Sequence, residues 1–299
     1  MKAQHLTFII ALLGSMIVTA QSDTTYWKTG GFVAATFSQV SLSDSWAAGG
    51  SENIAINGAT GLFADFKNGR NTWENSLDLG YGIINQNNIG FEKSDDKINL
   101  VTKYGHQIVE GDTRWFFSGI LDFRTQFQEG YVQTETGDSL ISNFMVPGYL
   151  TIGLGADYRP NAKISFSYIP LTGKFTFVND QGLADKGAYG VDPGKKSRAE
   201  LGSFLRIKYK DEVITNVDVE SRLELFSNYI QDFGTIDVNW QTTIVMKVNK
   251  VLSANFFTHL IYDKDIKTLD DEGVSGDAKI QFKSVFGVGL AYNFGAARK

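Results

Sequence analysis

The chain has 299 residues, a formal net charge of −5 and no cysteine. Without cysteine it has neither a disulfide framework nor the thioether-linked anchor of a bacterial lipoprotein. The mild acidity and the absence of a basic block argue against nucleic acid as a partner.

Residues 1–20 have the pattern of a secretory signal peptide. Lys2 precedes the apolar run LTFIIALLGSMIV, and Val18 and Ala20 stand at positions −3 and −1 of a cleavage site. The apolar run is short for a bilayer span and ends in small residues. We therefore expect a signal peptide over residues 1–20 and one mature domain over residues 21–299.

The mature chain alternates between apolar and polar residues. Its stretches never approach the ~20 consecutive apolar residues that a transmembrane helix needs. From Ile280 to Phe294, apolar side chains fall on one face of an extended chain, whereas Lys, Gln, Gly and Asn fall mainly on the other. A period of two over about fifteen residues predicts a long β-strand. The pattern recurs in TWENSLDLGYGI, RWFFSGILDFRTQF, NVDVESRLELFSNY and IDVNWQTTIVMKV.

About twelve strands are expected by this criterion. They cover residues 30–42, 52–66, 71–85, 97–108, 113–127, 149–158, 163–177, 198–209, 215–229, 235–248, 252–262 and 278–294. Tight links (KNGR, VEGD, RPNA, KDEVI and NKV) alternate with mostly longer polar links such as 128–148, 179–197 and 263–276. Short periplasmic turns and longer outer loops are typical of outer-membrane barrels. We predict an all-β fold, a transmembrane up-and-down antiparallel β-barrel with both termini in the periplasm of a Gram-negative cell.

A soluble β-sandwich or a lipocalin-like barrel is the alternative, because these folds also alternate apolar and polar residues. Many of the predicted strands exceed the usual five or six residues. Most also carry an aromatic residue near one end of the apolar face, as the interfacial girdles of membrane barrels require. The residues that fit such girdles are Trp73, Trp115, Tyr158, Tyr209, Tyr229, Trp240, Tyr262 and Tyr292.

The polar face of these strands then lines the lumen, and its charges nearly balance. The acidic residues are Glu74, Asp78, Asp122, Asp157, Glu200, Asp218, Glu220, Glu224 and Asp237. The basic residues are Lys103, Arg114, Arg124, Arg206, Lys208, Arg222, Lys247, Lys279 and Lys283. Balanced charges on the walls of a narrow barrel can pair across the lumen. We expect a lumen largely closed by ion pairs and loops, or at most a narrow pore; the alternative is that these groups are merely solvated.

Candidate catalytic residues are few. Beyond the signal peptide the histidines are His106 and His259, so a barrel hydrolase acting on lipid or peptide would have to use one of them with a serine or carboxylate. The acidic loop YDKDIKTLDDEG lacks the spacing of an EF-hand, and phosphate-loop, dinucleotide and zinc motifs are absent. We expect no catalytic, cofactor or metal site.

The segment SQVSLSDSWAAGG, residues 38–50, places Trp46 beside small residues. Gly49 and Gly50 can adopt backbone angles closed to other residues, which suits a packed turn at the corner of the first hairpin. A ligand loop is the alternative for this segment.

The chain resembles the Bacteroidota outer-membrane β-barrel proteins that are classed as a domain of unknown function, the DUF3078 family. The resemblance rests on WKTGGFVAATFSQVSLSDSWAAGG, with Trp46, Gly49 and Gly50 as its most specific residues, and on WENSLDLGYG, SYIPLTGKFTFV and the closing GLAYNF. It implies an outer-membrane barrel whose terminal strand, with Tyr292 and Phe294, carries the signal for the barrel-assembly machinery. It implies no activity.

These observations favour an integral membrane protein that is not an enzyme, either a scaffold or a narrow transport channel. The expected partners are outer-membrane lipid, the assembly machinery during insertion, and an envelope protein that contacts the outer loops.

Overall fold

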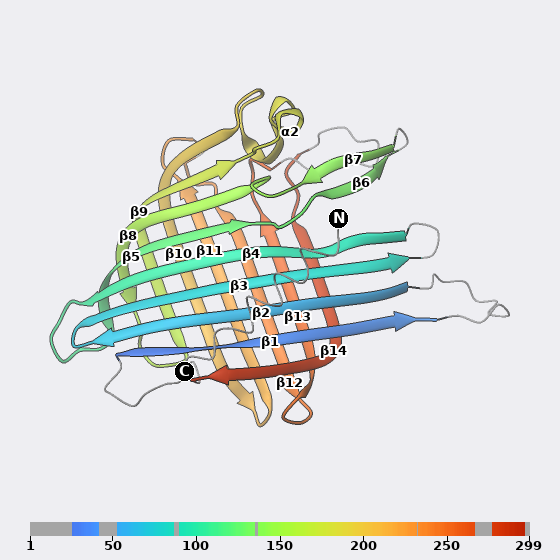
Figure 1. Ribbon diagram of the computed structural model, residues 1–299. Helices are drawn as coiled ribbons and strands as arrows, with labels where there is room; N and C mark the ends of the chain where they lie inside the picture. The colour runs from blue at the N-terminus through green and yellow to red at the C-terminus, as the bar shows by residue number, and fades with distance from the viewer. Residues whose placement is uncertain are drawn as a thin grey trace.

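The computed structural model of the chain describes residues 26–41, 53–86, 90–134, 137–231, 233–266 and 277–296. Within these residues, twelve antiparallel strands close into a barrel, and each pairs with its neighbours along the chain (Figure 1). The strands are β1 (Trp27–Val40), β2 (Asn53–Asn68), β3 (Asn71–Gln86), β4 (Gly90–Gln107), β5 (Trp115–Thr125), β8 (Gly148–Tyr158), β9 (Ile164–Phe177), β10 (Ser197–Ile214), β11 (Val217–Asn228), β12 (Asp237–Lys247), β13 (Leu252–Tyr262) and β14 (Gln281–Gly295). The predicted fold class is confirmed.

Two strands are longer than the alternation predicts. β4 begins at Gly90 rather than near residue 97. The alternation does not reveal this first part of the strand, because residues 92–96 are all polar and a bulge opposite Gly82 and Ile83 of β3 shifts the register there. β10 continues to Ile214, so the predicted tight link KDEVI is wrong. That segment is the end of a strand with a bulge, and the turn itself is formed by residues 215–216.

The apolar face of the strands points outward, as the alternation predicts. On β14, Phe282, Phe286, Leu290 and Tyr292 are each 58–67% exposed. A water-facing surface would not tolerate such a continuous array of large apolar side chains, whereas the lipid face of a membrane barrel requires it. None of the helices in the described part of the chain is long and apolar enough to cross a membrane.

Aromatic rings gather at the end of the barrel that carries the short turns. The Trp27 ring lies 5.2 Å from that of Phe66 and 5.8 Å from that of Trp73, and the rings of Trp115 and Tyr158 are 4.4 Å apart. β1 begins and β14 ends here, where Ala296 N–H donates to Thr29 C=O at 2.9 Å. This end carries an interfacial belt of the kind that membrane barrels use.

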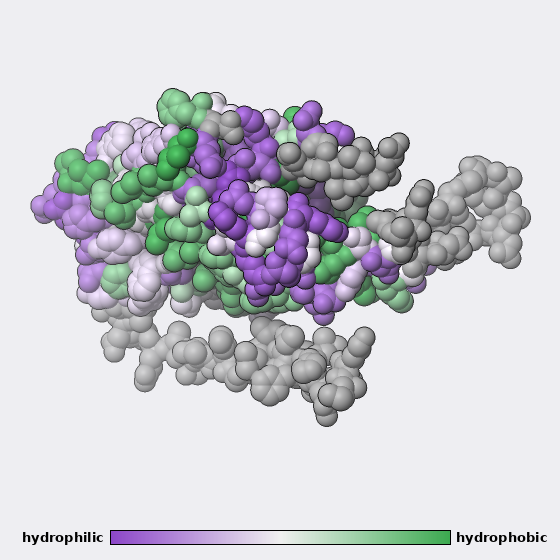
Figure 2. Space-filling model, turned by 90° about the horizontal axis from the view of Figure 1, so that it is seen from above, coloured by the Kyte–Doolittle hydropathy of each residue, from purple (hydrophilic) through white to green (hydrophobic). Residues whose placement is uncertain are grey.

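The opposite end carries a folded cap that the sequence patterns do not predict. Two segments expected to be polar loops form the hairpin β6 (Gly130–Thr134) and β7 (Gly137–Ser142) and the short helices α2 (Gln181–Asp185) and η1 (Ala188–Gly190). Seen from above, hydrophilic residues cover much of this face, and hydrophobic residues appear beside them (Figure 2).

A small apolar core joins the two cap segments. Val146 from one segment packs with Val178, Ala184 and Val191 from the other, and each is at most 3% exposed. The hydroxyl of Tyr189 donates to the backbone C=O of Ile141, and burial raises the pKa of Tyr189 to about 12, which keeps this donor protonated. The cap is therefore a packed unit over one side of the barrel mouth.

Several predictions fall on residues outside those described. These are the signal peptide over residues 1–20 and the first-hairpin corner with Trp46, Gly49 and Gly50.

Candidate functional site in the barrel lumen

Charged residues from three strands meet in the middle of the lumen. We call Asp122, Arg124, Arg206, Arg222 and Glu224 the middle cluster. Arg124 on β5 donates to Asp122 at 2.9 Å and to Glu224 on β11 at 2.6 Å. Arg206 on β10 donates to Glu224 at 2.8 Å and also pairs with Asp122. Arg222 lies 3.5 Å from Glu224. Because β8 and β9 separate β5 from β10, these bonds cross the lumen rather than run along one wall.

Apolar side chains fill the space beside the middle cluster. Ile120, Ile169, Phe204 and Phe226 pack together inside the barrel and are at most 6% exposed. The guanidinium of Arg206 lies over the Phe204 ring at 5.2 Å. The sequence analysis missed this group, although Ile120, Phe204 and Phe226 share the parity of the charged residues beside them. On this side of the barrel the interior contains a packed apolar core.

A second cluster lies inside the barrel near the short turns. Asp157 on β8 accepts from Lys103 at 2.6 Å and from Arg159 at 2.9 Å, and Arg159 also donates to Glu74 on β3 at 2.5 Å. The Arg159 guanidinium lies over the Phe116 ring at 4.6 Å. Arg159 was not among the predicted lumen residues, because it stands in the RPNA link just beyond β8.

A third cluster ties the cap to the barrel mouth. Lys174 on β9 donates to Asp237 at 2.7 Å and to Asp263 at 3.0 Å. Arg198 donates to Asp265 at 2.6 Å and to the backbone C=O of Gly190 in η1 at 3.1 Å. Arg198 thereby joins η1 of the cap to Asp265 just beyond β13, while Lys174 joins the mouth ends of β9, β12 and β13.

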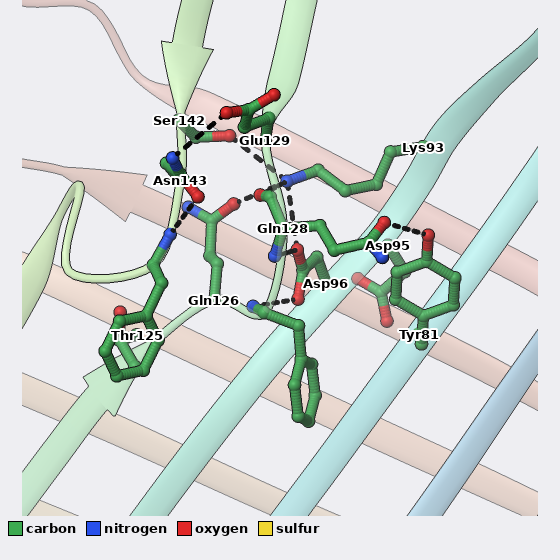
Figure 3. A network of polar contacts seen from close by, with 12 residues as sticks. Tyr81, Lys93, Asp95, Asp96, Thr125, Gln126, Gln128, Glu129, Ser142 and Asn143 are labelled. Carbon is green, nitrogen blue, oxygen red and sulfur yellow. Dashed lines mark hydrogen bonds and ion pairs between the residues drawn. The ribbon is translucent and has the colours of Figure 1, made fainter. Parts of the chain in front are cut away.

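The hairpin side of the cap is anchored to β4 (Figure 3). Asp96 accepts from the backbone N–H groups of Phe127 at 2.7 Å and Gln128 at 3.0 Å. Lys93 donates to Asp96 at 3.0 Å and to Ser142 at the end of β7 at 3.2 Å. The polar residues that break the alternation at the start of β4 are thus the attachment points of the cap.

A further bridge crosses between β14 and β4. Lys283 donates to Asp95 at 2.7 Å and to the backbone C=O of Ser94 at 3.1 Å. His259, on β13, is the register partner of Lys283. The basic side chains of Lys97, Arg124, Arg222 and Lys283 lie around it.

Among the described residues, both histidines have side-chain amides as their hydrogen-bond partners. His106 Nδ1 lies 2.8 Å from Asn71 Oδ1, and His259 Nε2 lies 2.8 Å from Asn239 Oδ1. His259 also contacts Gln241 at 3.3 Å. Side-chain amides hold both rings, whereas a nucleophile or an orienting carboxylate would be needed for hydrolysis. Among the described residues, groups of acidic, histidine or cysteine side chains that could hold a metal ion are not found.

Comparisons with known proteins give one family model and several solved outer-membrane barrels of low identity. A family model described as a protein of unknown function (DUF3078) matches residues 37–131, about a third of the chain. No curated protein matches. The COG4313 outer membrane channel from Pseudomonas putida F1 is 11% identical, with a TM-score of 0.42 over 93% of this chain and 100% of that one.

Two other solved structures are similar at the same low level. The NanC porin is 8% identical, with a TM-score of 0.40 over 88% of this chain and 98% of that one. The translocator domain of the autotransporter NalP from Neisseria meningitidis is 11% identical, with a TM-score of 0.33 over 97% and 95% of the two chains. Identities this low concern the barrel architecture alone.

The remaining residues of the predicted network lie apart from the middle cluster. Arg114 stands in the turn between β4 and β5 and donates to Asp112 at 2.8 Å. Lys279 is exposed just before β14. The other residues make local contacts between neighbouring strands. Asp218 pairs with Lys247, and Glu220 pairs with Lys210. Asp78 lies on β3 within electrostatic range of Lys97 on β4.

The two residues of the predicted terminal signal, Tyr292 and Phe294, lie on the outer face of β14. Their rings are stacked with centroids 6.4 Å apart. They pair in register with Val33 and Gly31 of β1 at the closed part of the barrel seam.

Proposed function

We propose that the protein is an outer-membrane β-barrel of a Bacteroidota cell that acts as a narrow, gated transport channel and not as an enzyme. In this proposal the short turns and both termini face the periplasm, and the cap faces outward. The long strands with their apolar outer face and the aromatic belt support a membrane location. The amide environment of His106 and His259 speaks against the hydrolase alternative.

The observation that carries the proposal is the middle cluster. Bonds from Arg124 to Glu224 and from Arg206 to Asp122 join strands on different sides of the lumen. The middle cluster contains three basic and two acidic side chains that are largely buried, so an ion that entered would have to displace a partner. Breaking a buried ion pair by removing one partner costs about 3–5 kcal/mol. The lumen is therefore closed here at rest, and passage requires these bonds to rearrange.

The cap supports gating at the mouth. It is attached by Lys93 and Asp96 on one side and by Arg198 on the other. Each attachment is polar and is made by single side chains. Such contacts exchange more readily than the apolar core of the barrel wall.

Single-channel recording in planar bilayers tests this function. The wild-type protein is expected to show small, brief conductance steps. Replacing Arg124 and Glu224 together by alanine removes one positive and one negative charge and should raise the unitary conductance severalfold. The matched control is Lys210→Ala with Glu220→Ala, because this pair is half-exposed and lies at 3.5 Å between adjacent strands.

The outcomes separate the two forms of the proposal. A large, stable wild-type conductance would contradict a lumen closed by the middle cluster. Silence in every folded variant would instead favour a closed scaffold whose outer surface contacts an envelope partner.

A further inference from the structure

The barrel closes through β1 and β14, and their pairing stops before either strand ends. The last register pair is Phe37 opposite Val288. Beyond this pair, β1 continues to Val40. β14 begins at Gln281, and its residues 281–287 are paired with β13 but have no register partner on β1. Figure 1 shows β14 turning sharply away from β1 beyond this point. The seam between the first and last strands is therefore open over part of its length.

The bend in β14 follows from glycine. A Cβ at Gly289 would lie 2.1 Å from the backbone oxygen of Ala35, and one at Gly287 would lie 3.2 Å from the Cβ of Thr36. Only glycine lets β14 approach β1 this closely at Gly289, and glycine inside a strand permits a sharp bend. The closed part of the seam thus ends at its tightest contact.

Continuing the register would set residues 38–40 opposite residues 285–287. In the described part of the chain these two segments do not pair with each other. Unpaired backbone groups cost several kcal/mol each in hydrocarbon. A gap at this place is costly unless water or a ligand reaches it.

A cavity of about 230 Å³ lies in the gap. Its outer rim includes Phe37 and Phe286, which are 50% and 61% exposed on the lipid-facing side. Its inner wall includes Asn57 and Ser94, whose side chains are hydrogen bonded to each other at 3.1 Å inside the barrel. The cavity therefore passes through the wall from an apolar outer rim to a polar inner end.

Lys283 stands close to the inner end of this cavity. Its side chain and that of its partner Asp95 are 39% and 41% exposed, so their charges remain accessible to a ligand. Lys283 adjoins Ser284 of the cavity wall and donates to the Ser94 C=O. Five bases stand against four acids in this part of the lumen: Lys97, Arg124, Arg206, Arg222 and Lys283 against Asp78, Asp95, Asp122 and Glu224.

We propose that the gap is a lateral portal through which a single-chain amphiphile with an anionic head group passes between the bilayer and the lumen. The proposal rests on the membrane-barrel function above and adds the route and the substrate class. The tail lies between Phe37 and Phe286, and the head group contacts Lys283. The cavity equals about seven or eight water molecules at about 30 Å³ each, which suits part of one acyl chain and excludes a folded peptide.

The chain contains no cysteine, so a disulfide can be placed cleanly across the gap. Gln39→Cys with Phe286→Cys joins the two positions that a continued register would set opposite each other. The control, Ala35→Cys with Leu290→Cys, joins a pair already in register in the closed part of the seam. Both pairs are studied in lipid nanodiscs, oxidised and reduced, with a short bismaleimide as a second cross-linker if oxidation is incomplete.

The probe is dodecanoic acid that carries a photoreactive diazirine on its chain, with attachment sites mapped by mass spectrometry. Wild-type protein should be labelled on the lumen residues Asn57 and Ser94. In the gap variant, which lacks the Phe286 ring, oxidation should lower this labelling at least tenfold relative to the same variant when reduced. The control pair should leave it unchanged. Lys283→Met should weaken lumen labelling by dodecanoic acid but not by the matching dodecanol probe, which has no charge.

Three results would overturn the portal. Lumen labelling that survives the cross-link would show entry through the mouth, and a lack of lumen labelling in wild-type protein would show that such amphiphiles do not enter. A disulfide between the cysteine at position 39 and a strand of another protein would show that the unpaired edge of β1 is a docking site. Conductance measured on the same samples distinguishes these failures from failure of the channel function.

Discussion

Arg124 and Glu224 are 100 residues apart in the chain, yet their side chains are joined by a 2.6 Å hydrogen bond across the barrel lumen. The bond holds β5 to β11, which are separated by three other strands along the wall. A barrel of about twelve strands is intermediate between the filled eight-stranded and the open sixteen-stranded kinds. In this barrel, side chains from β5, β10 and β11 meet inside the wall at mid-strand.

Loss of one partner from the middle cluster should destabilise the barrel. Arg206→Met removes one of the two guanidinium groups shared by Asp122 and Glu224, so that Arg124 alone must pair with both buried carboxylates. We expect the free energy of unfolding, measured by urea titration in detergent, to fall by about 3–5 kcal/mol. Lys195→Met is the control, because the Lys195–Asp192 pair is 70% and 75% exposed and should contribute less than about 1 kcal/mol.

The two strand glycines Gly155 and Gly58 should respond differently to alanine. A Cβ at Gly155 would lie 2.1 Å from the backbone oxygen of Tyr168, whereas at Gly58 the nearest atom is 3.8 Å away. Gly155→Ala should therefore disturb the pairing of β8 with β9 and cost about 1–3 kcal/mol. Gly58→Ala should leave the urea midpoint nearly unchanged, and equal effects of the two substitutions would contradict the packing at β8.

The strands could be predicted from the sequence, because apolar and polar residues alternate along them and the apolar set faces lipid. The contacts inside could not, because parity places Arg206 and Glu224 on the lumen face without saying which strand lies opposite. The cap was missed for a different reason. Its core is built from Val146, Val178, Ala184 and Val191, which are spread over two polar segments without any period.

Attachment of the cap through Asp96 should be visible in hydrogen exchange. The carboxylate accepts from the backbone N–H groups of Phe127 and Gln128. Asp96→Ala removes both acceptors, and we expect these two amides to exchange at least tenfold faster. Asp138→Ala, at an exposed position in the same hairpin, is the control and should leave both rates unchanged.

The turn between β4 and β5 should show a local response to pH. The Arg114 side chain, and then its backbone N–H, donate to Asp112 and lower the pKa of that carboxyl to about 2. Because the folded-state pKa lies below the ordinary value of 3.8, the stabilising contribution is complete above about pH 4 and is lost as the pH falls toward 2. Arg114→Met should return the carboxyl pKa toward its ordinary value in an NMR titration, and an unchanged midpoint would contradict the contact.

Gel migration in detergent before and after boiling tests the central claim, a membrane barrel, most directly. A detergent-extracted barrel stays folded in the unheated sample and migrates at a different position once boiling unfolds it. We expect such a shift for wild-type protein recovered from the membrane fraction. A single unshifted band, recovered without detergent in the soluble fraction, would contradict the account.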